Sequence, residues 1–170
     1  MEKKNTHIIY GFVTGIIMVI TGLIIYKTGM AFKPGIQYIA YIPFLVGIIL
    51  NGIAFSKAKD GYVTFGNVFG SCFRAAMIVT LVMVAWSILS MVIFPEMKEK
   101  ALAMAREEML KKNYTDEQID LALSMTKKYW NAFLIAGSVF GYLFWGAIFS
   151  LIGGAIPKKK GPQPLVANNL

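Results

Sequence analysis

The sequence has 170 residues, of which 56% are hydrophobic and only 15% are charged. A soluble domain usually carries about 45–50% apolar and about 25% charged residues, so we exclude a soluble globular protein. The formal net charge of +8 accompanies no basic stripe with interleaved aromatic residues on a solvated element, so we also expect no nucleic-acid partner. The single Cys72 cannot form an internal disulfide.

Four long uncharged segments dominate the sequence, at residues 8–26, 35–55, 75–94 and 130–156. A transmembrane helix needs about 20 mostly apolar residues to cross about 30 Å of hydrocarbon, and each segment is of that order or longer. We therefore predict an all-α, polytopic membrane protein, a four-helix transmembrane bundle in a single domain over residues 1–156. A signal peptide is the alternative for the first segment. Because signal peptides have apolar cores of only about 7–15 residues, we expect an uncleaved anchor.

An even number of spans places both termini on the same side of the membrane. Loops rich in Lys and Arg usually face the cytoplasm. Here the two sides carry almost equal numbers of basic residues, so their count does not determine the orientation. Three lysines at 158–160 follow the last span with no acid beside them, and they favour cytoplasmic termini. We expect residues 157–170 to form a disordered tail.

Residues 57–74, before the third span, combine an aromatic and a polar helical face. A helix of this kind suits the lipid–water boundary, and we predict an interfacial helix that continues into the third span, with Arg74 reaching the headgroups. The alternative is a ligand groove that uses Asn67 and Arg74. The predicted interfacial residues are Tyr62, Phe65, Phe69, Phe73 and Arg74, together with Trp130 at the start of the fourth span.

Residues 95–128 form the only sizeable solvated element, and we predict a charged helical hairpin there. Thr115 and Gln118 form a capping box that would open the second helix. The seven acidic and seven basic residues of this segment balance, which is typical of an ordinary solvated surface, and docking of a partner is the alternative. Three acid-first pairs stand at i, i+4 on the first helix, namely Glu96–Lys100, Glu107–Lys111 and Glu108–Lys112.

Small residues at regular spacing indicate where the spans pack, because lipid provides no hydrophobic force between helices. GxxxG pairs occur in the first span, before the third and in the fourth. The fourth span also carries an i+4 row of mostly small residues, 138–154, which we interpret as a packing seam, with a homodimer face as the alternative. The candidate packing residues are Gly11, Gly15, Gly137, Gly141, Gly146, Ser150 and Gly154.

Within the second span, Pro43, Gly47 and Asn51 share another i+4 row. We expect Asn51 to hydrogen-bond across the bundle, although broken helices of this kind also occur at transporter binding sites. No Asp, Glu, Lys or Arg lies within the four spans, whereas ion-coupled transport usually needs one. No hydrolase, metalloprotease or nucleotide-binding motif occurs, so we expect no enzyme activity, no cofactor and no metal site.

The chain resembles the bacterial "domain of unknown function 4199" family of small membrane proteins. The resemblance rests on the stretch at 61–69, on the step Thr115-Asp116-Glu117-Gln118-Ile119 in the charged insert, and on the order of the four spans. It implies a membrane protein of the cell envelope with an uncharacterised role, and supplies no catalytic residues.

We therefore expect a structural or protein-interaction component of the bacterial inner membrane. Its partners would be the lipid bilayer and either a second copy of the chain or another membrane protein. The alternative is a small oligomeric transporter or channel subunit, with a water-accessible path past Asn51, Thr80, Ser87 and Ser90.

Overall fold

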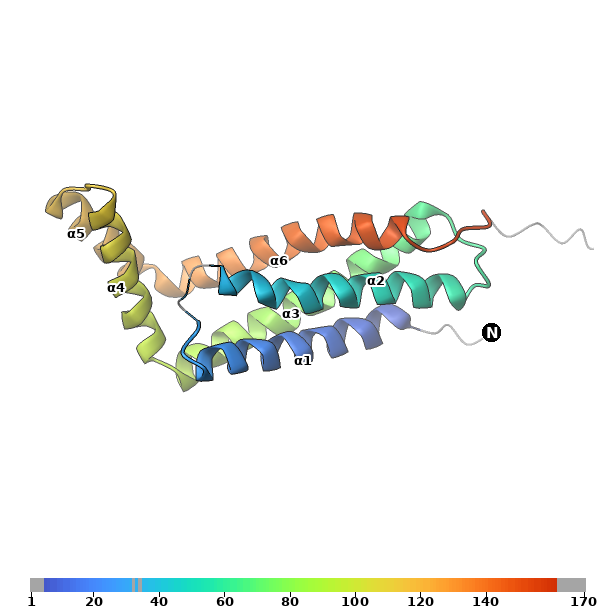
Figure 1. Cartoon of the computed structure of the whole chain (residues 1–170), viewed down its shortest axis with the longest axis horizontal. Coiled ribbons are helices and arrows are strands. Elements are labelled where there is room, and N and C mark those ends of the chain that lie inside the picture. Colours follow the sequence, from blue (N-terminus) through green and yellow to red (C-terminus); the bar gives the residue numbers. More distant parts are fainter. Residues whose placement is uncertain (1–4, 32, 34, 162–170) are drawn as a thin grey trace, which may run out of the picture.

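Four long helices lie side by side along the longest axis of the molecule (Figure 1). The computed structural model describes residues 5–31, 33 and 35–161. Helices α1 and α3 run in one direction and α2 and α6 in the other, so the described ends of the chain lie at the same end of the bundle. The four helices are α1 (Thr6–Lys27), α2 (Tyr41–Lys57), α3 (Phe65–Ile93) and α6 (Trp130–Ala155), and the short 3-10 helix η1 (Ile36–Ala40) leads into α2.

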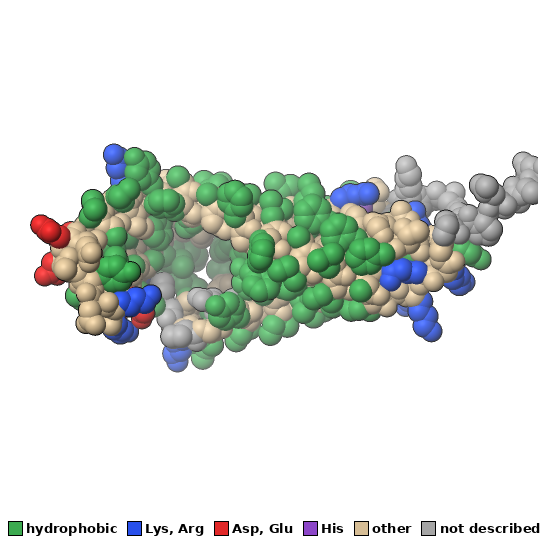
Figure 2. Space-filling view, turned by 90° about the horizontal axis from the view of Figure 1, so that it is seen from above, with side chains coloured by type: hydrophobic (Ala, Val, Ile, Leu, Met, Phe, Trp, Pro, Cys, Tyr) green, Lys and Arg blue, Asp and Glu red, His purple; other side chains and the backbone are tan. Residues whose placement is uncertain are grey.

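Each long helix is long and apolar enough to cross a membrane. The candidate spans have 22, 20, 29 and 26 residues, or about 30–44 Å at about 1.5 Å per residue. Hydrophobic side chains cover the middle of the surface, and charged ones gather at its two ends (Figure 2). Because a bilayer covers apolar surface and leaves the ends in water, this distribution fits a transmembrane bundle. The prediction of an all-α, four-span membrane protein is confirmed.

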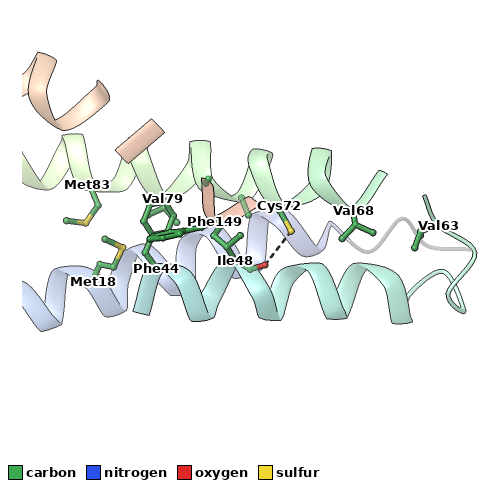
Figure 3. Packing of buried hydrophobic residues seen from close by; sticks show 11 residues of the cluster. Met18, Phe44, Ile48, Val63, Val68, Cys72, Val79, Met83 and Phe149 are labelled. Atoms are coloured by element: carbon green, nitrogen blue, oxygen red, sulfur yellow. Dashed lines mark hydrogen bonds between the residues drawn. The ribbon is translucent and has the colours of Figure 1, made fainter. Parts of the chain in front are cut away.

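The apolar core lies along the centre of the bundle (Figure 3). Helix α3 packs against α1, α2 and α6, and α2 packs against α1 and α6. Phe44 of α2 is fully buried, and its ring meets the ring of Phe149 edge-on at 5.3 Å between centroids. Buried side chains from all four helices complete this core, among them Met18, Ile48, Cys72, Val79 and Met83.

The predicted interfacial helix is the first part of α3, and the predicted continuity with the third span is confirmed. The helix begins at Phe65, because the Thr64 hydroxyl caps it by accepting a hydrogen bond from the Asn67 N–H at 3.3 Å. Asn67 returns the bond, since its Oδ1 accepts from the Thr64 N–H. Tyr62 precedes the helix, so its predicted place on the aromatic helical face is wrong.

The charged hairpin consists of α4 (Glu96–Lys111) and α5 (Asp116–Lys128), which extend beyond one end of the bundle (Figure 1). Leu102 and Ile119 are buried in it. The predicted capping box is confirmed, because the Thr115 hydroxyl accepts from the Gln118 N–H and Gln118 returns the bond.

None of the three acid–base pairs at i, i+4 on the first hairpin helix forms an ion pair within 4.0 Å. Lys111 instead pairs with Glu108, three residues earlier, at 3.1 Å, and Arg106 of α4 faces Asp120 of α5 at 3.8 Å. Within the described residues these two are the only ion pairs. Exposed lysine side chains move freely enough that sequence spacing alone does not select their partner.

Residues 157–161 follow α6 and contact the connection between α2 and α3. The Ser56 hydroxyl donates to the carbonyl of Lys158 at 2.9 Å, and the Lys160 N–H donates to the carbonyl of Gly61 at 2.7 Å. These bonds tie residues 158–160 to the connection between α2 and α3. The first residues of the predicted tail, 157–161, thus contact the rest of the chain, and residues 162–170 lie outside the described residues.

Candidate functional site

Two glycines of α1 let its backbone lie directly on α3. A Cβ atom on Gly11 would stand 2.8 Å from Cβ of Ile78, and one on Gly15 would stand 2.9 Å from Cβ of Val82. Real Cβ atoms do not approach so closely, so any larger residue would force the helices apart. The first candidate packing pair thus lies at the α1–α3 contact.

The later part of α6 meets α3 in the same way. Gly146 lies against Ala76, and Gly154 lies against the backbone and ring of two aromatic residues, Phe69 and Phe65. Ser150 between them is fully buried, and its hydroxyl donates to the carbonyl of Gly146 at 2.6 Å. These three candidate residues therefore line the α3–α6 contact.

A buried polar cluster joins α2 and α3 near the bundle end that carries the termini. Asn51 is fully buried, and its Nδ2 donates to the Ser71 hydroxyl at 3.2 Å. The Cys72 thiol beside it donates to the Ile48 carbonyl at 3.4 Å. The predicted hydrogen bond of Asn51 across the bundle is therefore present, and it ends on α3.

This half of the bundle is closely packed. Asn51 is 0% exposed and Thr80 is 5% exposed, and the Thr80 hydroxyl donates to a carbonyl of its own helix, that of Ala76. Gly52 of α2 and Gly153 of α6 approach so closely that a Cβ on Gly52 would stand 2.5 Å from the Gly153 carbonyl oxygen. The packing leaves Asn51 and Thr80 enclosed by protein.

The other half of the bundle is hollow where it meets the hairpin (Figure 2). Two neighbouring cavities of about 350 Å³ each share Ser90, Phe94 and Met97 in their walls. One lies among α1, α3 and α6 and reaches Ser87, whose hydroxyl is 3.2 Å from that of Ser138. The other lies at the base of α4, against the start of α6. Ser87 and Ser90 thus face open space, unlike Asn51 and Thr80.

Gly137 and Gly141 lie on a different side of α6 from Gly146. A Cβ atom on either residue would meet nothing within 4 Å. Phe133, Phe140 and Phe144, which flank them along the helix, are all exposed. Within the described residues this GxxxG pair therefore contacts no other helix of the chain.

The predicted interfacial residues occupy the two ends of the bundle. Phe65, Phe69 and Phe73 stack in sequence along α3, with 6.0 Å between successive ring centroids, and Arg74 beside them is exposed. The Lys160 ammonium lies 5.2 Å from the Tyr62 ring at this same end. The alternative prediction is a ligand groove that uses Asn67 and Arg74. The Asn67 side chain instead caps α3, so its oxygen is already engaged in a hydrogen bond within the chain.

Trp130 lies at the opposite end, where three lysines converge that the sequence patterns did not indicate as a group. Lys98 comes from α4, and Lys127 and Lys128 come from the end of α5. The Lys98 ammonium lies 6.0 Å from the Trp130 ring and donates to the Lys127 carbonyl at 3.4 Å. The only sequence signal was the position of these lysines beside a tryptophan at a span boundary.

The arrangement provides surfaces and cavities for apolar and amphipathic partners. Among the residues that the structure describes, no group of three His, Cys, Asp or Glu side chains is placed to hold a metal ion. The candidate functional features are therefore the hairpin-end cavities, the lysines beside them and the open face of α6.

A family described as "Protein of unknown function (DUF4199)" matches residues 9–159, which is most of the chain. No curated protein and no solved structure matches the chain.

Proposed function

The chain belongs to the DUF4199 family of proteins of unknown function, and we propose that this multi-pass membrane protein is a structural or protein-interaction component of the bacterial inner membrane. Its partner in this proposal is a second copy of the same chain. The face that would mediate the contact runs along α5 and α6. The proposed role is not catalytic.

The observation that carries the proposal is an exposed apolar row that starts outside the membrane. Leu121 and Met125 of α5 are 64% and 50% exposed, although the hairpin extends beyond the last residues of the spans. Lipid cannot cover side chains in water, so a protein partner is the natural cover for them. Exposed residues continue along the chain at Tyr129, Phe133 and Gly137, and Gly141 follows one turn later, while the row turns gradually around the helix.

The membrane part of this row suits a second helix. Gly137 and Gly141 leave open space where another backbone can approach, and the exposed rings of Phe133, Phe140 and Phe144 supply packing surface around them. Small residues at this spacing favour close contact between helices in lipid. A twofold dimer uses the same patch on both copies, and a row along one helix pair can satisfy that condition.

Disulfide trapping in native membranes tests the proposal. Single cysteines replace Leu121, Met125, Phe133 or Gly141 in a Cys72→Ser chain, and Ile16→Cys on the exposed face of α1 is the control. We expect a crosslinked dimer from at least one position on the row, and none from position 16.

A second variant links the trapped dimer to the glycine pair. Gly137→Leu is expected to reduce crosslinking at the row at least tenfold, because it fills the space that a second helix would occupy. Gly22→Leu is the matched control, since Gly22 is also a span glycine, and a Cβ atom on it would meet nothing within 4 Å. Equal crosslinking in the two variants, or a chain that is monomeric in its native membrane, would contradict the proposal.

The alternative, a small oligomeric transporter or channel subunit, has less support. A path through one chain would have to pass Asn51 and Thr80, which are enclosed by protein. Phe44 and Val79, both fully buried, lie between Cys72 and the two methionines, Met18 and Met83, that line one hairpin-end cavity (Figure 3).

We also propose that the termini face the cytoplasm. Lys57, Lys59 and residues 158–160 lie together at the terminal end of the bundle, where the Ser56 and Lys160 hydrogen bonds join the two segments. Basic residues next to span ends favour the cytoplasmic side. Thiol labelling from outside intact cells would decide, with labelling expected at Asn113→Cys in the hairpin and not at Lys57→Cys.

A further inference from the structure

Three lysine residues line one cleft at the junction of α4, α5 and α6. The cleft has a volume of about 290 Å³, and its wall includes Lys98, Lys127 and Lys128 with Tyr129, Trp130 and Asn131. Lys98 is half-buried, with its ammonium over the Trp130 ring. Lys128 lies in the same way over the Tyr129 ring, 5.3 Å from its centroid. Two of the three ammonium groups thus lie over aromatic rings of residues that line the cleft.

The three ammonium groups have no anionic partner within the described part of the chain. The two ion pairs found there involve Arg106 and Lys111, and no carboxylate lies within 4.0 Å of Lys98, Lys127 or Lys128. Glu99 shares a separate groove with Lys127 but forms no ion pair with it. These three residues bring unpaired positive charge to one cleft, and a bound anion would be attracted to that charge.

An apolar cavity adjoins the cleft. It has a volume of about 350 Å³, which is within the range of ligand pockets, and shares Lys98, Trp130 and Asn131 with the cleft. Phe94, Met97 and Leu134 are among the apolar residues in the rest of its wall. A cleft lined by lysines and a mostly apolar cavity therefore lie next to each other and share three residues.

The depth of this site in the membrane indicates what could occupy it. The site lies at the last residues of α3, which ends at Ile93, and at the first residues of α6, which begins at Trp130. The ends of spans lie at the lipid–water boundary, where tryptophan and lysine gather. A phospholipid places its phosphate at this boundary and its acyl chains in the adjoining hydrocarbon, so its two parts match the lysine cleft and the apolar cavity.

We propose that the junction of α4, α5 and α6 binds an anionic phospholipid, with its phosphate in the lysine cleft and the start of one acyl chain in the apolar cavity. Lysine binds phosphate as a point charge, so the cleft does not require a fixed headgroup geometry. Because the cleft alone would also fit a soluble phosphate, the adjoining cavity is the feature that assigns a lipid. The inference does not depend on the proposed dimer, since every residue of the site belongs to one chain.

Native mass spectrometry of the full chain in detergent tests the site. The probes are dioleoyl phosphatidylglycerol, dioleoyl phosphatidylcholine with the same chains, and glycerol 3-phosphate without chains. We expect the first to bind most tightly. Removing one surface lysine weakens anionic lipid binding about fivefold, so the triple variant Lys98→Gln, Lys127→Gln, Lys128→Gln should bind phosphatidylglycerol on the order of a hundredfold more weakly.

The matched control is Lys100→Gln, Lys111→Gln, Lys112→Gln, which removes the same charge from other hairpin positions. It should bind phosphatidylglycerol as the unmodified chain does. Ala101→Phe, which places a ring in the apolar cavity, should weaken phosphatidylglycerol while leaving glycerol 3-phosphate unchanged. Circular dichroism confirms that each variant is folded before its binding is compared.

A second readout locates the lipid. In a chain with Trp86→Phe and Trp145→Phe, phosphatidylglycerol with brominated chains should quench Trp130 fluorescence, and the lysine triple variant should lose that quenching. Equal binding of the two lipids, equal loss in both triple variants, or glycerol 3-phosphate that binds as tightly as the lipid would each overturn the proposal.

Discussion

The phenol of Tyr26, in the last turn of α1, donates a hydrogen bond to the carboxylate of Glu96, in the first turn of α4. The two residues are 70 positions apart in the sequence. The Tyr26 ring also lies 4.6 Å from the Phe94 ring, measured between centroids. This contact joins the base of the hairpin to the end of the first span.

The contact has a defined pH dependence. The hydrogen bond from Tyr26 lowers the pKa of Glu96 below its usual value of 4.5. Because the folded-state pKa is lowered, the contact is fully present above the usual carboxyl pKa and is lost as the pH falls through the lowered value. Carboxyl ¹³C NMR of Glu96 should show a higher pKa in Tyr26→Phe than in the unmodified chain. Tyr114→Phe, at the tip of the hairpin, should leave the Glu96 titration unchanged, and equal midpoints in all three chains would contradict the assignment.

Gly11 is expected to be intolerant of any side chain. Gly11→Ala brings a methyl group to within 3.0 Å of the Ala75 carbonyl and to 2.8 Å from Ile78, so α1 must move off α3. Overpacking of this kind costs about 1–3 kcal/mol in the free energy of unfolding. Unfolding by SDS in mixed micelles measures the loss. Gly22→Ala is the control, and a loss as large as that of Gly11→Ala would show that helix propensity or lipid contact, and not packing, is responsible.

The hydrogen bond between Asn51 and Ser71 is expected to contribute only modestly to stability. Bonds of this kind inside membrane proteins average about 0.6 kcal/mol, because the unfolded chain in lipid also finds partners. A double-mutant cycle with Asn51→Ala and Ser71→Ala should give a coupling energy of about that size. A cycle that pairs Asn51→Ala with Ser87→Ala, whose hydroxyl bonds to Met83 and not to Asn51, should give none. Equal coupling in the two cycles would mean that the measured energy does not arise from the Asn51–Ser71 bond.

Thiol labelling distinguishes a blind cavity from a path through the bundle. In a Cys72→Ser chain, a small membrane-impermeant reagent should modify Ser90→Cys, which faces both hairpin-end cavities. It should not modify Asn51→Cys or Thr80→Cys, which replace enclosed residues. Native Cys72, which is fully buried, should also resist the reagent in the unmodified chain. Labelling at all four positions would support the transporter or channel alternative.

The bundle and the hairpin could be predicted because their signals are local. An uncharged run of about 20 residues must be helical in lipid, since every backbone group needs a partner and none is available outside the chain. The Thr115–Gln118 capping box is equally local, because its two hydrogen bonds close within four residues. The Thr64–Asn67 box has the same geometry but was missed, because the helical pattern places Asn67 on a polar face and gives no sign that it caps the helix.

The sequence could not predict which face of α6 points into the bundle. Gly137, Gly141 and Gly146 look alike in the sequence. At about 100° per residue, however, Gly137 lies about 180° around the helix from Gly146, and Gly141 lies about 140° around it from Gly146. Periodicity places them on different faces without saying which face is inside. The structure places Gly146 against α3 and leaves Gly137 and Gly141 open.

By itself, the sequence determined that the chain crosses a membrane four times and carries a charged helical hairpin between the last two crossings, because hydrocarbon solvent and local hydrogen bonds act on short stretches of chain. Only the tertiary structure decided which glycines bring helices together. It also decided that Asn51 is sealed in while Ser90 faces a cavity, and that Lys98 meets Lys127 and Lys128. Those outcomes depend on contacts between residues far apart in the chain, and their distances are set by how four helices rotate and pack against one another.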